Sequence, residues 1–173
     1  MRQFARQVVA LASIAMAAAW FGAQPVEARE VVAFRDPGVS AGTVIVRTHE
    51  RRLYYVIGDG RAIRYPVGVG RAGKQWAGTT RIDGKYVKPA WAPPKEVKRD
   101  KPSIPDLIPG GSPRNPMGAA ALTLAGGEYA IHGTNVPGSV GGFVSYGCIR
   151  MYNQDVVDLY DRVSVGTTVM VVR

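Results

Sequence analysis

Short runs of β-branched and aromatic residues, separated by glycine turns, recur along this chain and constrain its fold more than any other feature. Such runs favour strands, because branched and aromatic side chains pack well on a pleated surface and glycine adopts the backbone angles of tight turns. The first two runs cover residues 43–48 and 53–57, and a glycine turn at 58–60 leads into an extended segment over 62–69. This pattern predicts a hairpin.

Further strands follow the same pattern. We expect a pair of strands about Asp83-Gly84 within residues 79–87, two more at 119–124 and 128–132, and a last strand at 168–172. The sequence therefore predicts a mainly β fold.

One segment near the C-terminus has a helical pattern instead. Apolar residues recur at i, i+3, i+4 and i+7 from Val156 to Val163, and Asn153 precedes them as a candidate N-cap. We therefore expect one or two short helices beside the strands.

Residues 91–117 interrupt the strands with a proline-rich, basic stretch. A long loop inside a compact domain is often a lid or a binding element. A solvated excursion fits the composition equally well, so both interpretations stay open.

The N-terminus has the pattern of a secretory signal peptide. Arg2 and Arg6 precede an uncharged apolar stretch over residues 8–22, and Val26-Glu27-Ala28 follows as a small-residue cleavage site. The apolar stretch is shorter than the roughly 20 residues that span a bilayer, although an uncleaved anchor is the alternative. We expect a signal peptide over 1–28, an irregular leader over 29–42, a catalytic domain over 43–173, and a mature protein in the periplasm or cell envelope without stable membrane insertion.

The charge is strongly positive. Lys and Arg number 22 against 13 acidic residues, which gives +9, and removal of residues 1–28 takes away two arginines and one glutamate to leave +8. An exported protein rarely meets nucleic acid, so we expect no such partner. The charge fits an acidic envelope polymer, and a merely soluble cationic surface fits it equally well.

No metal or cofactor is expected. One Cys and two His are too few for a zinc site, and His49 lies in a charged turn that is interpreted as surface. Residues 68–73 match G-x-G-x-x-G, but no helical pattern follows to hold a pyrophosphate, so the match is interpreted as a chance one.

The strongest chemical candidate is the single cysteine, Cys148, together with His132. A cysteine reacts as the thiolate, so it needs a nearby base or positive charge, and imidazole suits that role near neutral pH. His132 ends a predicted strand, and the glycine-rich connection allows Cys148 to return beside it. Arg150 adds positive charge for the thiolate or for a substrate carboxylate. From spacing alone, a small buried Cys and a structural His remain the alternative.

The segment from Ile131 to Met151 resembles the signature of the YkuD-like L,D-transpeptidase catalytic domain. It contains a His-Gly-Thr-Asn block and then Ser-Tyr-Gly-Cys-Ile-Arg, and the likeness extends over roughly residues 43–173. Many members have His at the position of Tyr146. The resemblance implies a β-sandwich-like domain with these site residues: Cys148 as nucleophile, His132 as base, the Gly133 carbonyl orienting His132, and Ser145, Tyr146, Gly147 and Arg150 at the oxyanion or substrate.

The resemblance also implies the reaction. Cys148 would attack the bond between diaminopimelate and D-Ala in a tetrapeptide stem of peptidoglycan, and an amine would resolve the acyl-enzyme. That amine belongs to another stem, giving a 3→3 crosslink, or to an envelope protein. The same chemistry implies acylation by carbapenems. An L,D-carboxypeptidase that uses water, and a non-catalytic wall-binding module, are the alternatives.

Overall fold

The computed structural model describes residues 29–173, so the expected signal peptide over 1–28 lies outside the described residues. Within them, nine strands form one sheet in the order β1-β4-β3-β2-β11-β6-β7-β8-β10, and β5 pairs with β9 separately. The strands in chain order are β1 (Glu30–Ala33), β2 (Val44–Arg47), β3 (Arg52–Gly58), β4 (Arg61–Pro66), β5 (Val69–Gly70), β6 (Gly78–Val87), β7 (Ala120–Leu124), β8 (Ala130–His132), β9 (Phe143–Ser145), β10 (Ile149–Arg150) and β11 (Thr168–Val172). The helices are α1 (Lys95–Asp100), the 3-10 turn η1 (Pro137–Ser139) and α2 (Asn153–Arg162). The expected mainly β fold with short helices is confirmed.

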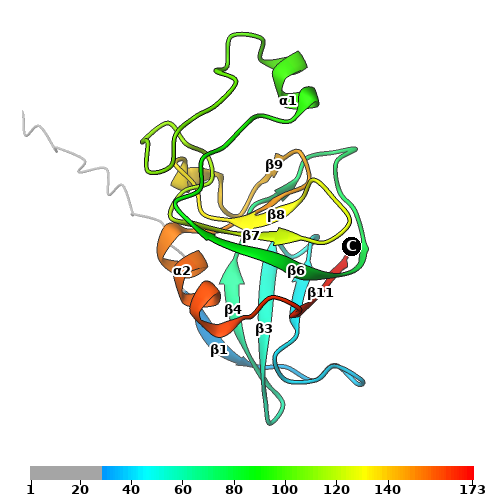
Figure 1. Ribbon diagram of the computed structural model, residues 1–173. Helices are drawn as coiled ribbons and strands as arrows, with labels where there is room; N and C mark the ends of the chain where they lie inside the picture. The colour runs from blue at the N-terminus through cyan, green and yellow to red at the C-terminus, as the bar shows by residue number, and fades with distance from the viewer. Residues whose placement is uncertain (1–28) are drawn as a thin grey trace, which may run out of the picture.

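Strand β6 belongs to both halves of the sheet. Its first residues pair with β11 and its later residues pair with β7, and the register shifts between Ile82 and Gly84. Figure 1 shows β6, β7 and β8 crossing β3 and β4. One buried cluster combines side chains from both halves, among them Leu53 and Leu122. The sheet therefore folds into two layers around a shared core, as in a sandwich.

The expectation of two strands within residues 79–87 is wrong, because β6 is a single strand. Gly84 makes no turn. A side chain there would lie 2.6 Å from the ring of Tyr86 and 2.7 Å from the hydroxyl of Thr123. The glycine therefore serves close packing and the bulge, rather than a hairpin.

The hairpin expected about residues 58–60 is confirmed, since β3 and β4 pair antiparallel across it. The extended segment that follows is divided into β4 and β5, and β5 leaves the main sheet to pair with β9. The leader over 29–42, expected to be irregular, contains β1, which pairs antiparallel with β4. The reason lies in its apolar residues: Phe34 joins a second buried cluster with Tyr54 on the outer face of the sheet.

Helix α2 packs its apolar stripe on the core. Val156 and Leu159 are fully buried, as the helical pattern predicts. Asn153, expected as the N-cap, is instead the first helical residue and makes no cap bond. Its Oδ1 accepts hydrogen bonds from the backbone amides of Ala119 and Thr134, at 3.0 and 3.1 Å. Asn153 thus ties the helix to the ends of β7 and β8.

Residues 91–117, which we call the lid segment, carry α1 and stand above the sheet in Figure 1. The neck of the segment is closed by a bridge between Trp91 and Ile108. Buried Asn115 reinforces it, because its Nδ2 lies within 3.2 Å of the carbonyl oxygens of Pro89, Ile108 and Pro109. Across residues 29–173, no helix has the length and apolar character needed to cross a bilayer.

Candidate active site

Strand pairing places the cysteine and histidine on one face of the sheet. Strands β8 and β10 run parallel, with Ile131 opposite Ile149 and His132 opposite Arg150. Both isoleucines are buried in the core. Because side chains alternate along a strand, His132 and Arg150 point to the other face, and Cys148 joins them as the residue two positions before Arg150. Cys148 therefore lies diagonally across from His132.

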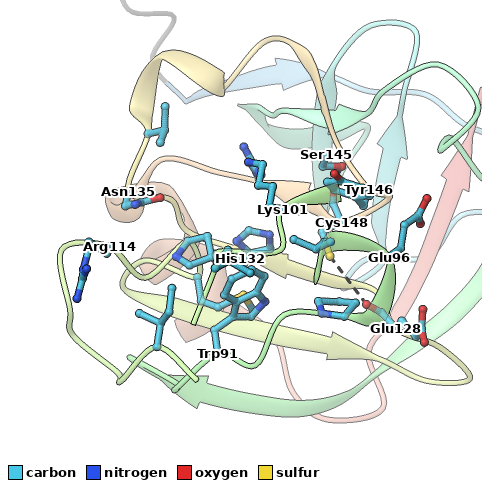
Figure 2. A pocket seen from close by; sticks show the side chains of 18 residues that line it. Trp91, Glu96, Lys101, Arg114, Glu128, His132, Asn135, Ser145, Tyr146 and Cys148 are labelled. Carbon is cyan, nitrogen blue, oxygen red and sulfur yellow. Dashed lines mark hydrogen bonds between the residues drawn. The ribbon is translucent and has the colours of Figure 1, made fainter. Parts of the chain in front are cut away.

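Both side chains line one cavity of about 330 Å³ between the sheet and the lid segment. Figure 2 shows this cavity, with Trp91 of the lid segment close to His132 and with Glu128 beyond Cys148. The apolar lining supplied by the lid segment consists of Trp91, Pro94, Val97, Ile104, Ile108, Pro116 and Met117. The proline-rich stretch is therefore packed over the cavity that contains Cys148, and this favours the lid over the solvated excursion.

The imidazole of His132 is fixed by a backbone carbonyl. Its Nδ1 lies 2.6 Å from the carbonyl oxygen of Gly133, and because a carbonyl only accepts, Nδ1 carries the proton. Nε2 then holds the free lone pair that a base requires. Glycine is needed at 133, since a side chain there would lie 2.3 Å from Oδ1 of Asn153.

The pair is neutral at rest. Burial, aided by the charge of Arg150, lowers the pKa of His132 to about 4. Burial also raises the pKa of the Cys148 thiol, against the opposing effects of the Ala130 amide and of Arg150. Near neutral pH these shifts favour a thiol and a neutral imidazole, an arrangement in which the histidine is able to accept a proton from the thiol.

The turn before the cysteine is held by Ser145. Its hydroxyl accepts a hydrogen bond from the Gly147 amide at 3.0 Å and donates one to the Cys148 carbonyl at 2.6 Å. Ser145 and Gly147 were expected at the oxyanion or the substrate, and in this structure the Ser145 hydroxyl and the Gly147 amide are each engaged with an internal partner. Sequence alone does not show which way an amide points. In the part of the chain that is described, the amides of Tyr146 and Cys148 donate none of the turn or loop hydrogen bonds, so these two amides remain for an oxyanion.

Two aromatic residues that the sequence analysis missed support this turn. Gly147 has a φ of +127°, and a side chain there would lie 2.3 Å from the ring of Tyr129. Tyr129 stacks on Trp76 with ring centroids 5.0 Å apart, and Nε1 of Trp76 donates to the Gly147 carbonyl at 2.9 Å. No local pattern marks either aromatic, because both act through contacts distant in sequence.

Arg150 supplies positive charge without an internal counter-ion. None of the ion pairs found in residues 29–173 includes it, and its Nε is buried without a hydrogen-bond partner. Its side chain lines the same cavity as Cys148. An unpaired guanidinium of this kind suits a carboxylate of a bound substrate.

The other sequence candidates lie outside the cavity. His49 is largely exposed beside Glu50. The glycines at 68 and 70 are required by close backbone contacts with Ser139 and Lys74, and a turn and β6 follow rather than a helix. The described residues contain no group of three or more His, Cys, Asp or Glu placed to hold a metal ion.

Comparison with protein families gives a match to the YkuD L,D-transpeptidase catalytic domain over residues 41–171. The chain belongs to this family. Among curated YkuD relatives, the probable L,D-transpeptidase ErfK/SrfK of Escherichia coli is 38% identical over 138 residues, which are 75% of this chain and 43% of that protein. This chain thus spans less than half the length of that relative.

Solved structures agree on the YkuD fold. An L,D-transpeptidase from Mycobacterium smegmatis superposes with a TM-score of 0.60 at 19% identity, covering 76% of this chain and 58% of the other. A Brucella melitensis protein described as a probable carnitine operon oxidoreductase is 37% identical, with a TM-score of 0.56 over 84% of this chain and 93% of the other.

Tyr146, two residues before Cys148, donates its hydroxyl proton to Oδ2 of Asp100 at 2.8 Å. Asp100 is the last residue of α1 in the lid segment. Tyr146 is thus engaged with the lid segment, and His132 is the imidazole that lines the cavity.

Proposed function

We propose that this protein is an exported L,D-transpeptidase that acts on peptidoglycan stem peptides through a Cys148 acyl-enzyme. The observation that carries the proposal is the parallel pairing of β8 with β10, which sets Cys148, His132 and Arg150 on one face in one cavity. Membership in the YkuD family supports the class of reaction.

In the first half-reaction, Nε2 of His132 takes the thiol proton as the Cys148 sulfur attacks the carbonyl carbon between diaminopimelate and D-Ala. The negative charge that forms on the carbonyl oxygen is stabilised by the amides of Tyr146 and Cys148. The C–N bond then breaks, the imidazolium returns its proton to the leaving amine of D-Ala, and a thioester remains.

In the second half-reaction, an acceptor amine attacks the thioester and gives a proton to His132. The C–S bond breaks and the protonated imidazole restores the thiol. The acceptor is a second diaminopimelate, which yields a 3→3 crosslink, or an amine of an envelope protein. The apolar lining from the lid segment supports aminolysis, because it limits water around the thioester.

The decisive experiment incubates the protein, without residues 1–28, with disaccharide tetrapeptides and measures intact masses of the products. We expect release of D-Ala and crosslinked dimers, with both absent in Cys148→Ala. Tripeptide without dimer would identify an L,D-carboxypeptidase instead. Sacculus binding that persists in Cys148→Ala, without any turnover or carbapenem adduct in the wild type, would identify a wall-binding module.

Export is proposed from the basic start and apolar stretch of residues 1–28. Expression of the full chain in a bacterial host, followed by mass analysis of the periplasmic fraction, should give a protein that begins at Arg29. A full-length mass confined to the membrane fraction would favour the uncleaved anchor.

A further inference from the structure

Three side chains from separate parts of the chain meet beside the turn over residues 145–148, which we call the nucleophile turn. Tyr146 donates its hydroxyl proton to Oδ2 of Asp100 at 2.8 Å, and Nη2 of Arg71 lies 3.0 Å from the same oxygen. The guanidinium of Arg71 also lies over the ring of Tyr146, 4.2 Å from its centroid. Arg71 follows β5, Asp100 ends α1, and Tyr146 stands two residues before Cys148, so the three contacts form a closed triangle.

This triangle links the tip of the lid segment, which we define as residues 92–107 with helix α1, to the body of the protein. The neck of the segment is held at its other end by Asn115 and the Trp91–Ile108 bridge. A second ion pair also joins the tip to the body of the protein: Nζ of Lys74 lies 2.5 Å from Oε1 of Glu96, which is on α1. The tip is therefore attached mainly through charged contacts, whereas the neck is attached through backbone and buried amide contacts.

The attachment controls what covers the cysteine. Val97 and Ile104 lie on the tip and line the cavity that contains Cys148. A donor and an acceptor peptide must both reach the sulfur, and they reach it past the side chains of the tip that line this cavity. Movement of the tip would change this access, and the partly exposed ion pair of Arg71 and Asp100 is weak enough to break reversibly.

We propose that Arg71, Asp100 and Tyr146 form a latch that holds the lid segment closed over Cys148, and that Tyr146 is a positioning residue that couples lid closure to the nucleophile turn. Tyr146 thus has a role distinct from proton transfer. The electrostatics agree, because Tyr146 and Arg71 hold the pKa of the Asp100 carboxyl below its usual value, so the latch is charged at neutral pH. The latch goes beyond the proposed function and does not depend on the identity of the acceptor.

Two measurements that need no turnover test the latch. The first is the rate at which iodoacetamide alkylates Cys148, the single cysteine of the chain. The second is the rate of limited trypsin cleavage after Lys95, Lys98 and Arg99, which lie on α1. We expect Tyr146→Phe to raise both rates about threefold, because it removes one hydrogen bond to a charged group, and Asp100→Asn to raise them about tenfold, because it removes the ion pair as well.

Salt and charge reversal separate a latch from a general loss of structure. Raising NaCl from about 0.1 to 1 M shortens the screening length from about 10 to 3 Å. It should therefore accelerate both reactions more in the wild type than in Asp100→Asn, which has lost the pair with Arg71 and keeps the Lys74–Glu96 pair. Arg71→Asp alone should open the tip. The double exchange Arg71→Asp with Asp100→Arg should recover most of the wild-type protection, since it restores an ion pair.

The matched controls are Tyr86→Phe and Asp161→Asn, two exposed side chains outside the cavity. Neither should change either rate, and far-UV circular dichroism should be unchanged in all variants. Wild-type rates in both Tyr146→Phe and Asp100→Asn would overturn the latch. So would faster alkylation without faster trypsin cleavage, because that would place the effect in the nucleophile turn alone. Failure of muropeptide turnover with these rates as expected would count against the proposed function and leave the latch standing.

Discussion

The charge on Arg150 acts on both members of the reactive pair. It favours the thiolate of Cys148 and disfavours the imidazolium of His132. These two effects oppose each other in a thiolate–imidazolium pair. Burial, the larger cause for both groups, disfavours both ions, so transfer of the proton is expected during the reaction rather than at rest. Arg150 therefore tunes a pair whose resting state is set mainly by burial.

Replacing Arg150 by Gln should make Cys148 less reactive. Without the positive charge, the pKa of the thiol rises further and the thiolate fraction at pH 8 falls, so alkylation should slow by about threefold to tenfold. The rate of alkylation by iodoacetamide between pH 6 and 10 measures this. In the wild type the rate should climb steadily with pH. A plateau from pH 5 to 8 would instead reveal a preformed ion pair, and exposed Arg81→Gln serves as the control.

Gly147→Ala should destabilise the protein by about 2–4 kcal/mol. Its φ is +127°, and the added methyl would lie 2.3 Å from the Tyr129 ring, so backbone strain and overpacking act together. Urea unfolding measures the change. Gly138→Ala is the matched control, because nothing lies within 4 Å of the added carbon, and its effect should stay within about 0.5 kcal/mol. Equal effects of the two changes would contradict the proposed role of the aromatic pair.

At the scale of elements, the sequence correctly predicted those helices and strands whose residue pattern is visible within the element itself. The β3–β4 hairpin, β7, β8, β11 and the apolar stripe of α2 follow from residues adjacent in sequence. The continuity of β6, by contrast, depends on Tyr86 and Thr123 packing against Gly84, and β1 depends on a partner strand thirty residues away. Thr123 and strand β4 lie outside β6 and β1, so a pattern within each element does not show these contacts.

The residues of the candidate site fall into two similar groups, those that a sequence motif contains and those that only the tertiary fold brings to the site. Cys148, His132 and Arg150 belong to one contiguous signature, so sequence could identify them. Trp76 and Asp100 reach the nucleophile turn only through the tertiary fold, and the direction of the Gly147 amide is set by the Ser145 hydroxyl. Motifs therefore identify the reacting groups, whereas the groups that position them require the structure.

The neck of the lid segment should depend on Asn115. Replacing it with Ala leaves the carbonyl groups of Pro89, Ile108 and Pro109 without their shared donor, at a cost of about 1–3 kcal/mol. Hydrogen exchange should then accelerate across residues 91–117 while the amides of β7 keep their protection. Gln154→Ala, on the exposed face of α2, is the control. Unchanged exchange in the lid segment would show that the Trp91–Ile108 bridge suffices by itself.

At the scale of the whole molecule, the sheet joins distant parts of the chain into one unit. The last strand, β11, lies between β2 and β6, parallel to the first and antiparallel to the second. Its residues Val169 and Val171 are buried in the same cluster as Ile131 and Ile149, which precede His132 and Arg150 by one position. The site therefore rests directly on the shared core, so the burial of His132 should contribute to global stability.

Acid should weaken the fold between about pH 6.5 and 4 through His132. The unfolded imidazole has its ordinary pKa near 6.5 and the folded one about 4, so only the unfolded state gains a proton in this window. The contribution is fully present above pH 6.5 and is lost as pH falls, with a total of about 3 kcal/mol. Urea unfolding at pH 7, 5.5 and 4.5 should follow this decline.

The carboxylates of Asp158 and Asp155 affect the pH dependence of stability differently from His132. Asp158, whose pKa is lowered by Arg162 and Tyr65, stabilises the fold above its unfolded value near 3.8 and loses that contribution only as pH falls further. Asp155 has the opposite sign, since burial raises its pKa. His132→Gln should therefore flatten the decline between pH 6.5 and 4.5, whereas His49→Gln should retain it. A decline of equal slope in both variants would mean that the loss of stability originates in the carboxylates and not in the buried imidazole.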